Sequence, residues 1–238
     1  TETVPKVAKI FGPGNAWVTA AKAIVAADPM GAALDMPAGP SEVMVVADAL
    51  SDPRFVALDL LSQAEHGPDS HAVLVTVDAG LVGRVEAEIE RALPNLSRAS
   101  VIERALRHGL AIIVRDLAEA GAVANEYAPE HLIVQVAGAR EFTASIRNAG
   151  SVFIGRWTPE SVGDYCSGTN HVLPTYGYAR AYSGLSVADF QRRMTLQEVS
   201  LTGLRGLAPT ARTLAELEGL DAHACAITVR LDAADTRP

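Results

Sequence analysis

The chain has 238 residues, of which 49% are hydrophobic and 20% are charged, enough for one large α/β domain with a buried core. A formal net charge of -8 argues against nucleic acid or an anionic membrane surface as the main partner and leaves small-molecule ligands open. Two cysteines, Cys166 and Cys225, are too few and too far apart for a disulfide framework, which favours a reducing, cytoplasmic setting. The sequence has no run of about 18 apolar residues, so no membrane span is predicted.

Residues 1–40 are predicted to hold one short strand and one helix, followed by the Pro/Gly-rich segment DMPAGPSE. We expect them to complete a domain whose other part lies outside the chain. In FGPGNAW, a glycine turn joins the strand to the helix, a geometry in which backbone N–H groups meet anions. A dinucleotide-binding fingerprint needs a third glycine where Trp17 stands. Both a structural turn and a ligand-binding loop therefore stay open.

The middle of the chain alternates strand and helix patterns. Strands are predicted at 42–48, 71–77, 110–116, 131–136 and 151–155, as nearly continuous apolar runs. Such runs are typical of parallel strands that are covered on both faces. Helices are predicted at 53–65, 80–93, 115–125 and 139–148. The alternation predicts an α/β fold, a mostly parallel sheet with helices on both faces that resembles an incomplete Rossmann fold.

After about residue 185 the strand pattern fades, and two stretches, 186–200 and 208–227, are predicted to be helical. This helical tail is too short to build a core of its own. We therefore expect it to pack on the body of the protein or on another subunit. The predicted parts of the chain are residues 1–40, 41–185 and 186–238.

Two pairs of polar residues stand beside the predicted strands. Gln63 and His66 are three residues apart, so they share one face of a helix. A helix-terminal histidine commonly compensates the helix dipole, and a metal-ligand pair is the alternative. Glu130 and His131 begin a strand. They suit a general acid–base couple, because both can titrate near neutral pH, although ordinary polar residues at a strand start explain them equally well.

Residues 160–180 are predicted to form a long polar, glycine-rich loop, a kind of segment that is commonly functional in compact domains. The loop contains Asp164 and Cys166. We interpret Cys166 as an unreactive thiol, because a nucleophilic thiol needs a partner base and a lowered pKa. Glu218 and His223 in the tail, taken alone, are explained by a surface helix.

Seven segments, in chain order, resemble those of the histidinol dehydrogenase family: FGPGNAWVTAAK, DMPAGPSEV, DLLSQAEHG, APEHL, NAGSVFIG, SVGDYCSGTNHVLPT and GLDAHACAI. The resemblance runs across essentially the whole chain. It implies a zinc-dependent, NAD-linked enzyme that oxidises L-histidinol through the aldehyde to L-histidine, the last step of histidine biosynthesis. Family members carry a long additional N-terminal portion, so the resemblance implies that this chain is the C-terminal part of one.

The resemblance also implies a role for particular residues. The implied zinc ligands are Gln63, His66, Asp164 and His223. Nitrogen and oxygen ligands suit a zinc ion that also accepts substrate nitrogens. His131 is implied as the base that takes the alcohol proton, and Glu130 as the residue that activates water on the aldehyde. The implied substrate contacts are Ser41, Gln63, His66, His131, Asp164, Glu218 and His223, and the implied NAD contact is Asn15.

Family members are homodimers in which the tail of one subunit enters the other's site, so the resemblance implies that Glu218 and His223 act in trans. It makes residues 1–40 the remnant of the NAD-binding domain, residues 41–185 the part with the zinc and catalytic residues, and residues 186–238 the shared tail. Two alternatives stay open. The chain is either a relative that oxidises another amino or sulfonated alcohol, or a catalytically dead dimerising fragment. Cys166 receives no role.

Overall fold

A computed structural model describes residues 3–236, so the outermost two residues at each end of the predicted parts 1–40 and 186–238 lie outside it. The described chain falls into two compact units, the first ending at Phe190 and the second beginning at Gln191. The boundaries at residues 40 and 185 remain predictions. No helix among residues 3–236 is long and apolar enough to cross a lipid bilayer.

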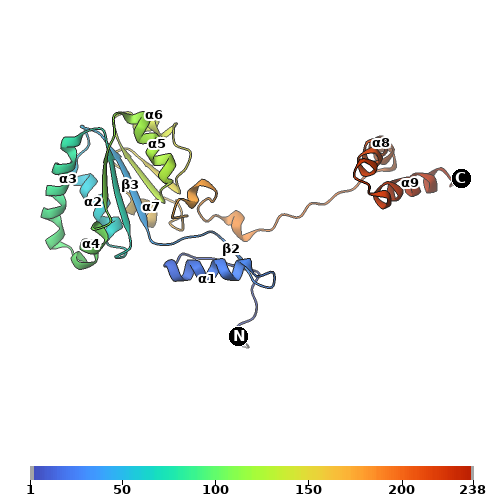
Figure 1. Cartoon of the computed structure of the whole chain (residues 1–238), viewed down its shortest axis with the longest axis horizontal. Coiled ribbons are helices and arrows are strands. Elements are labelled where there is room, and N and C mark those ends of the chain that lie inside the picture. The colour runs from blue at the N-terminus through green and yellow to red at the C-terminus, as the bar shows by residue number, and fades with distance from the viewer. Residues whose placement is uncertain (1–2, 237–238) are drawn as a thin grey trace. The chain divides into compact units, whose positions relative to one another are not determined.

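The first unit is built on a five-stranded parallel sheet with the strand order β5-β4-β3-β6-β7. Its strands are β3 (Glu42–Ala47), β4 (His71–Thr76), β5 (Leu110–Ile113), β6 (His131–Gln135) and β7 (Ser151–Ile154). The helices that follow the strands are α2 (Pro53–Ala64), α3 (Ala79–Ala92), α4 (Ala99–Leu106), α5 (Leu117–Tyr127) and α6 (Ala139–Thr143), with a 3-10 turn at Leu93–Asn95. Figure 1 shows α2, α3 and α4 on one face of the sheet and α5 and α6 on the other. The predicted α/β fold with a parallel sheet is confirmed.

Two helices differ from their predictions. The structure adds α4, which was missed, although Ile102 and Ala105 give it a buried face. The predicted helix 139–148 ends early, at Thr143. Beyond that point the side-chain oxygen of Asn125 accepts the backbone N–H groups of Arg147 and Asn148 at 2.6 and 3.2 Å, in place of helical carbonyl groups.

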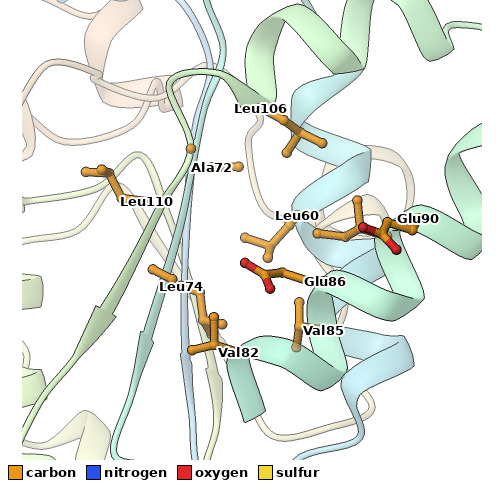
Figure 2. A pocket seen from close by; sticks show the side chains of 12 residues that line it. Leu60, Ala72, Leu74, Val82, Val85, Glu86, Glu90, Leu106 and Leu110 are labelled. Atoms are coloured by element: carbon orange, nitrogen blue, oxygen red, sulfur yellow. The ribbon is translucent and has the colours of Figure 1, made fainter. Parts of the chain in front are cut away.

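Strand β5 lies at one edge of the sheet and is mostly exposed, with Leu110 51% and Ile113 57% accessible. The prediction that every strand is covered on both faces is therefore wrong for β5, because an edge strand has a neighbour on one side only. A cavity of about 340 Å³ lies beside it, between α3 and β4 (Figure 2). Its lining is apolar apart from Glu86 and Glu90, and it contains none of the residues predicted for a functional site.

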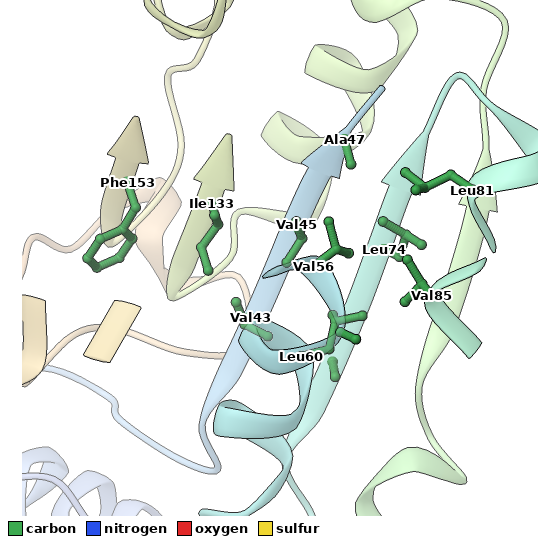
Figure 3. Packing of buried hydrophobic residues seen from close by; sticks show 12 residues of the cluster. Val43, Val45, Ala47, Val56, Leu60, Leu74, Leu81, Val85, Ile133 and Phe153 are labelled. Carbon is green, nitrogen blue, oxygen red and sulfur yellow. The ribbon is translucent and has the colours of Figure 1, made fainter. Parts of the chain in front are cut away.

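The core consists of two apolar layers, one on each face of the sheet. Val43 and Val45 of β3 face α2 and α3, and Figure 3 shows them beside Val56 and Leu60 of α2. Met44 and the other alternate residues of β3 pack instead against α5 and α6. Successive side chains of a strand point to opposite faces, so a strand that is covered on both faces must be apolar throughout. This explains the continuous apolar runs of the sequence.

Residues 9–34 form a separate small sheet, in which β1 (Lys9–Ile10) pairs in parallel with β2 (Ala33–Leu34) across helix α1 (Ala16–Ala27). Inside it, Lys22 Nζ forms a buried ion pair with Asp35 at 2.5 Å. The other carboxylate oxygen of Asp35 accepts the N–H of Gly12 at 2.8 Å. An internal carboxylate thus occupies the position that an external anion would take at this glycine, which supports the structural-turn interpretation of FGPGN.

The loop predicted at 160–180 begins instead with a short helix, α7 (Glu160–Tyr165), and Asp164 lies on this helix. The helix predicted at 186–200 is wrong as well. A 3-10 turn covers Val187–Phe190, and residues 191–200 have no regular secondary structure. Lys9 Nζ donates to the carbonyl oxygen of Asp189 at 3.0 Å, and the ring of Phe190 stacks on Phe11. A continuing helix would need that carbonyl group as an acceptor.

The second unit is a pair of helices, α8 (Leu201–Leu217) and α9 (Asp221–Asp235). The stretch predicted at 208–227 is therefore not one continuous helix, because Gly219, with φ +69°, turns the chain between the two helices. The pair buries Ala208 and Ala215 but leaves leucines such as Leu207 and Leu217 exposed. Two helices of this size cannot cover their apolar residues by themselves.

A buried carboxyl group in the first unit gives a prediction about stability. Asp59 accepts a hydrogen bond from Gln135 Nε2 at 2.5 Å, and burial raises its pKa to about 7. A carboxyl whose pKa is raised in the folded state loses stability as pH increases from about 4 to about 7, because only the unfolded chain ionises readily in that range. Among residues 3–236, Gln135 Oε1 has no hydrogen-bond partner.

We therefore expect Asp59→Asn to stabilise the first unit by on the order of 1–3 kcal/mol at pH 8 and by little at pH 4. The new amide accepts from Gln135 Nε2 as before and donates to the unpartnered Gln135 Oε1. Urea unfolding at the two pH values measures the difference. An equal change at both pH values, or a loss at pH 8, would show that ionisation of Asp59 does not limit stability.

Candidate active site

Most of the predicted site residues meet at the amino-terminal end of the central strands. Glu42 and His131 are the first residues of β3 and β6, which are neighbours in the sheet. Gln63 lies in the last turn of α2. Ligands of open α/β sheets usually bind at the carboxyl ends of the strands. Here α2 returns along the sheet after β3, so its carboxyl end, with Gln63, reaches the opposite edge.

His131 is buried, and its hydrogen bonds define which ring nitrogen carries the proton. Nδ1 lies 3.1 Å from the carbonyl oxygen of Glu42. A carbonyl group can only accept, so Nδ1 is the donor and Nε2 carries the free lone pair. Nε2 is buried and has no hydrogen-bond partner among residues 3–236, and it lies 3.8 Å from Asp164 Oδ1. Burial lowers the pKa of His131 to about 4, which keeps the ring neutral and able to accept a proton.

Glu130 stands beside this histidine, with Oε2 3.5 Å from His131 Nδ1. The same oxygen accepts the backbone N–H of Glu42 at 2.8 Å. Burial raises the pKa of Glu130 to about 9, and repulsion from Glu160, Glu42 and Asp164 adds to this effect. A nearby cation lowers the pKa of a carboxyl group in such a setting. The arrangement is an acid–base couple in a region of low dielectric constant.

Gln63 and Glu160 meet at the floor of the site. Gln63 is fully buried, and its amide forms hydrogen bonds here when its nitrogen faces Glu160, at 2.8 and 2.9 Å from the two carboxylate oxygens. Glu160 Oε1 also lies 3.7 Å from His131 Nδ1. Burial, with repulsion from Asp164 and Asp59, raises the pKa of Glu160 to about 8.

His66, Glu160 and Asp164 form a group with the ligand types of a metal site. One possible ligand atom from each of the three lies within 4.8 Å of those of the other two. Two of the three, His66 and Asp164, are predicted zinc ligands, and Gln63 contacts the third. Imidazole nitrogen and carboxylate oxygen are common zinc ligands, and the buried, unpartnered Nε2 of His131 adds a polar atom facing Asp164. These residues fit a zinc ion.

The remaining predicted residues lie elsewhere or serve another structural purpose. The carbonyl group of Ser41 accepts the N–H of His71 at 3.0 Å, at the edge of the site. Asn15 caps α1, where its side-chain oxygen accepts the N–H groups of Trp17 and Val18, each at 3.1 Å. Glu218 and His223 belong to the second unit, where they line a groove of about 640 Å³ together with apolar residues of α8 and α9.

The sequence did not single out Glu42 or Glu160, which are both buried in the site. Glu42 accepts the N–H of Tyr176 at 2.9 Å through Oε1, and its Oε2 has no hydrogen-bond partner among residues 3–236. Glu160 stands four residues before Asp164, the spacing that puts two residues on one face of a helix. That spacing was the available signal. Cys166 is exposed and has no part in the cluster.

The fold and the site define an α/β protein with a buried acid–base couple beside a cluster of metal-ligating side chains. A family model described as histidinol dehydrogenase matches residues 1–231. The chain belongs to the histidinol dehydrogenase family.

Individual relatives agree with this assignment. The histidinol dehydrogenase of Vibrio cholerae is 59% identical over 232 residues, which are 98% of this chain and 54% of that protein. The Escherichia coli enzyme is 57% identical over 233 residues, with the same two shares. A crystal structure of histidinol dehydrogenase from Elizabethkingia anophelis superposes with a TM-score of 0.93 at 47% identity, over 99% of this chain and 54% of that one. The chain spans about half the length of the curated relatives it matches.

Proposed function

We propose that the chain supplies the zinc and acid–base half of an enzyme that oxidises L-histidinol, through the aldehyde, to L-histidine with NAD. The observation that carries this proposal is the neutral, buried His131, whose free Nε2 faces the cluster of His66, Glu160 and Asp164. An alcohol oxidation needs a base at the hydroxyl group as the hydride leaves, and a buried imidazole of low pKa is available for that task.

Gln63, His66, Asp164 and His223 are proposed to hold the zinc ion. When bound there, zinc supplies a fixed point that orients the nitrogen atoms of the substrate. We propose that Ser41 and Glu218 make further substrate contacts, together with Gln63, His66, His131, Asp164 and His223. Chemical agreement supports this set: imidazole nitrogens, carboxylates and an amide oxygen suit a zinc ion that is also to accept substrate nitrogen.

His131 Nε2 takes the alcohol proton in the first oxidation, while the N–H of its Nδ1 stays on the Glu42 carbonyl group and fixes the ring. In the second oxidation, Glu130 takes a proton from the water that adds to the aldehyde. Glu130 must be ionised to do this. Its pKa of about 9 must therefore fall in the working site, in the direction in which a nearby cation moves it.

NAD supplies the hydride acceptor, and Asn15 is the proposed contact on this chain. The oxygen of Asn15 is committed to capping α1, so its exposed amide nitrogen is the group offered, and a donor suits the oxygens of a nucleotide. We propose that residues 1–40 belong to the cofactor-binding domain and residues 41–185 to the zinc-binding domain. The protein is proposed to work in the cytoplasm.

We propose that residues 186–238 cross into the site of a second copy in a homodimer. The exposed leucines of α8 and α9, and the position of Glu218 and His223 on an apolar groove, support this role for the second unit. A helix pair that cannot cover its own apolar residues needs a partner surface.

The test is to measure zinc binding and NADH formation in the protein as its gene encodes it. We expect one zinc ion per subunit, and we expect His66→Ala to weaken zinc binding by at least about 100-fold, since a ligand is lost. L-histidinol should be turned over faster than another amino alcohol or a sulfonated alcohol. A folded protein that binds no zinc at micromolar concentration would overturn the metal site, and a preference for another alcohol would overturn the substrate.

A further inference from the structure

Glu160 is a buried carboxyl group to which the proposed chemistry gives no role. It begins α7, and its side chain is 2% exposed. A carboxylate so deeply buried is costly unless its oxygens accept hydrogen bonds. The donor that the site offers is the amide nitrogen of Gln63, at 2.8 and 2.9 Å from the two oxygens.

This contact decides which way the Gln63 amide points. One end of a glutamine amide donates and the other accepts, and a carboxylate can be faced by the donating nitrogen. With the nitrogen on Glu160, the amide oxygen is directed to the other side. Gln63 is fully buried, so bulk water does not compete for either end. A metal ion binds the oxygen of an amide, and the orientation that satisfies Glu160 is also the one that leaves this oxygen free.

We infer that Glu160 is the positioning residue of the metal centre, which holds the Gln63 amide with its oxygen presented as a ligand. This inference rests on the proposed function, because it takes Gln63 to be a zinc ligand. Glu160 has an atom within 4.8 Å of the ligand atoms of His66 and Asp164. In this assignment it still acts through Gln63, because both of its oxygens face the Gln63 nitrogen.

The expected size of the effect follows from the way such partners act. A carboxylate that accepts the N–H of a metal ligand fixes the ligand's orientation and increases electron density on its coordinating atom. Loss of such a partner typically weakens metal binding by about 10–100-fold. Glu160→Gln keeps the size of the side chain but offers both a donor and an acceptor to Gln63, so the amide orientation is no longer determined.

The experiment is a double-mutant cycle on zinc affinity, measured by chelator competition in the protein as its gene encodes it. Glu160→Gln is expected to weaken zinc binding by about 10–100-fold, yet by less than about 2-fold when it is added to Gln63→Ala. Cobalt in place of zinc gives a second readout, since Glu160→Gln should change the visible absorption bands in the same direction as Gln63→Ala. Asp59→Asn, another buried carboxyl group, is the matched control and should leave zinc affinity within about 3-fold.

Three results would overturn the inference: an unchanged affinity in Glu160→Gln, an equal loss in the Gln63→Ala background, or an equal loss in Asp59→Asn. If Glu160→Gln does not fold, the cycle is run with Glu160→Asp, which keeps the charge and withdraws it by one methylene group. Failure of the proposed function is separate. It appears as a native protein that binds no zinc, and the inference then falls with it.

Discussion

Replacing His131 with asparagine is expected to lower kcat for histidinol oxidation by about 10²–10⁴-fold, the usual contribution of a general base. Asparagine retains an N–H that can reach the Glu42 carbonyl group, which His131 Nδ1 now contacts at 3.1 Å. It has no basic nitrogen to replace the unpartnered Nε2. Rapid-mixing measurement of the first NADH formed reports this step directly. Zinc affinity should stay within about 3-fold of native, because no ligand is removed.

Glu130→Gln is the comparison that separates the two oxidations. If Glu130 activates water on the aldehyde, this variant should slow oxidation of the added aldehyde far more than the first oxidation of the alcohol. His131→Asn should slow the first oxidation at least as much as the second. If both variants slow both oxidations equally, the division of roles between Glu130 and His131 is wrong. Preserved turnover in His131→Asn would remove the base from the scheme.

The strands could be predicted from the sequence because burial on both faces forces every position of β3, β4 and β6 to be apolar. The same reasoning failed at β5, whose four residues are as apolar as those of its neighbours although the edge strand is largely exposed. Apolar composition shows that a segment is a strand, but the number of covered faces depends on strand order. Strand order is set by contacts between distant residues, and the local pattern does not contain it.

The site was predictable to a different degree at each residue. Gln63 and His66 were visible as a pair because the helical repeat brings residues three apart onto one face. Glu160 was not visible, since an acidic residue in the first turn of a helix is usually explained by the helix dipole and by solvent. Its burial arises from the meeting of α7 with α2 and β6, which are far apart in the sequence. Asp164 was assigned to a loop because a six-residue helix is too short to show a periodic pattern.

Activity should reappear when two inactive variants, His131→Asn and His223→Ala, are combined in one dimer. If His223 completes the site of the neighbouring subunit, a mixed dimer contains one site with both histidines intact. Random pairing makes about half of the dimers mixed, so about one quarter of native activity is expected. Neither variant alone should give more than a small fraction of this. Co-expression with two different affinity tags, followed by purification on both, isolates the mixed dimer.

The matched control pairs His131→Asn with His66→Ala. Both of these residues lie in the first unit, on the same side of the proposed exchange, so no mixed dimer contains a complete site and no activity should return. Recovery in this control would show that the subunits exchange more than the tail. No recovery with His223→Ala, in a mixed dimer that binds zinc, would place His223 in the site of its own subunit. The exposed leucines of α8 and α9 would then need a different partner surface.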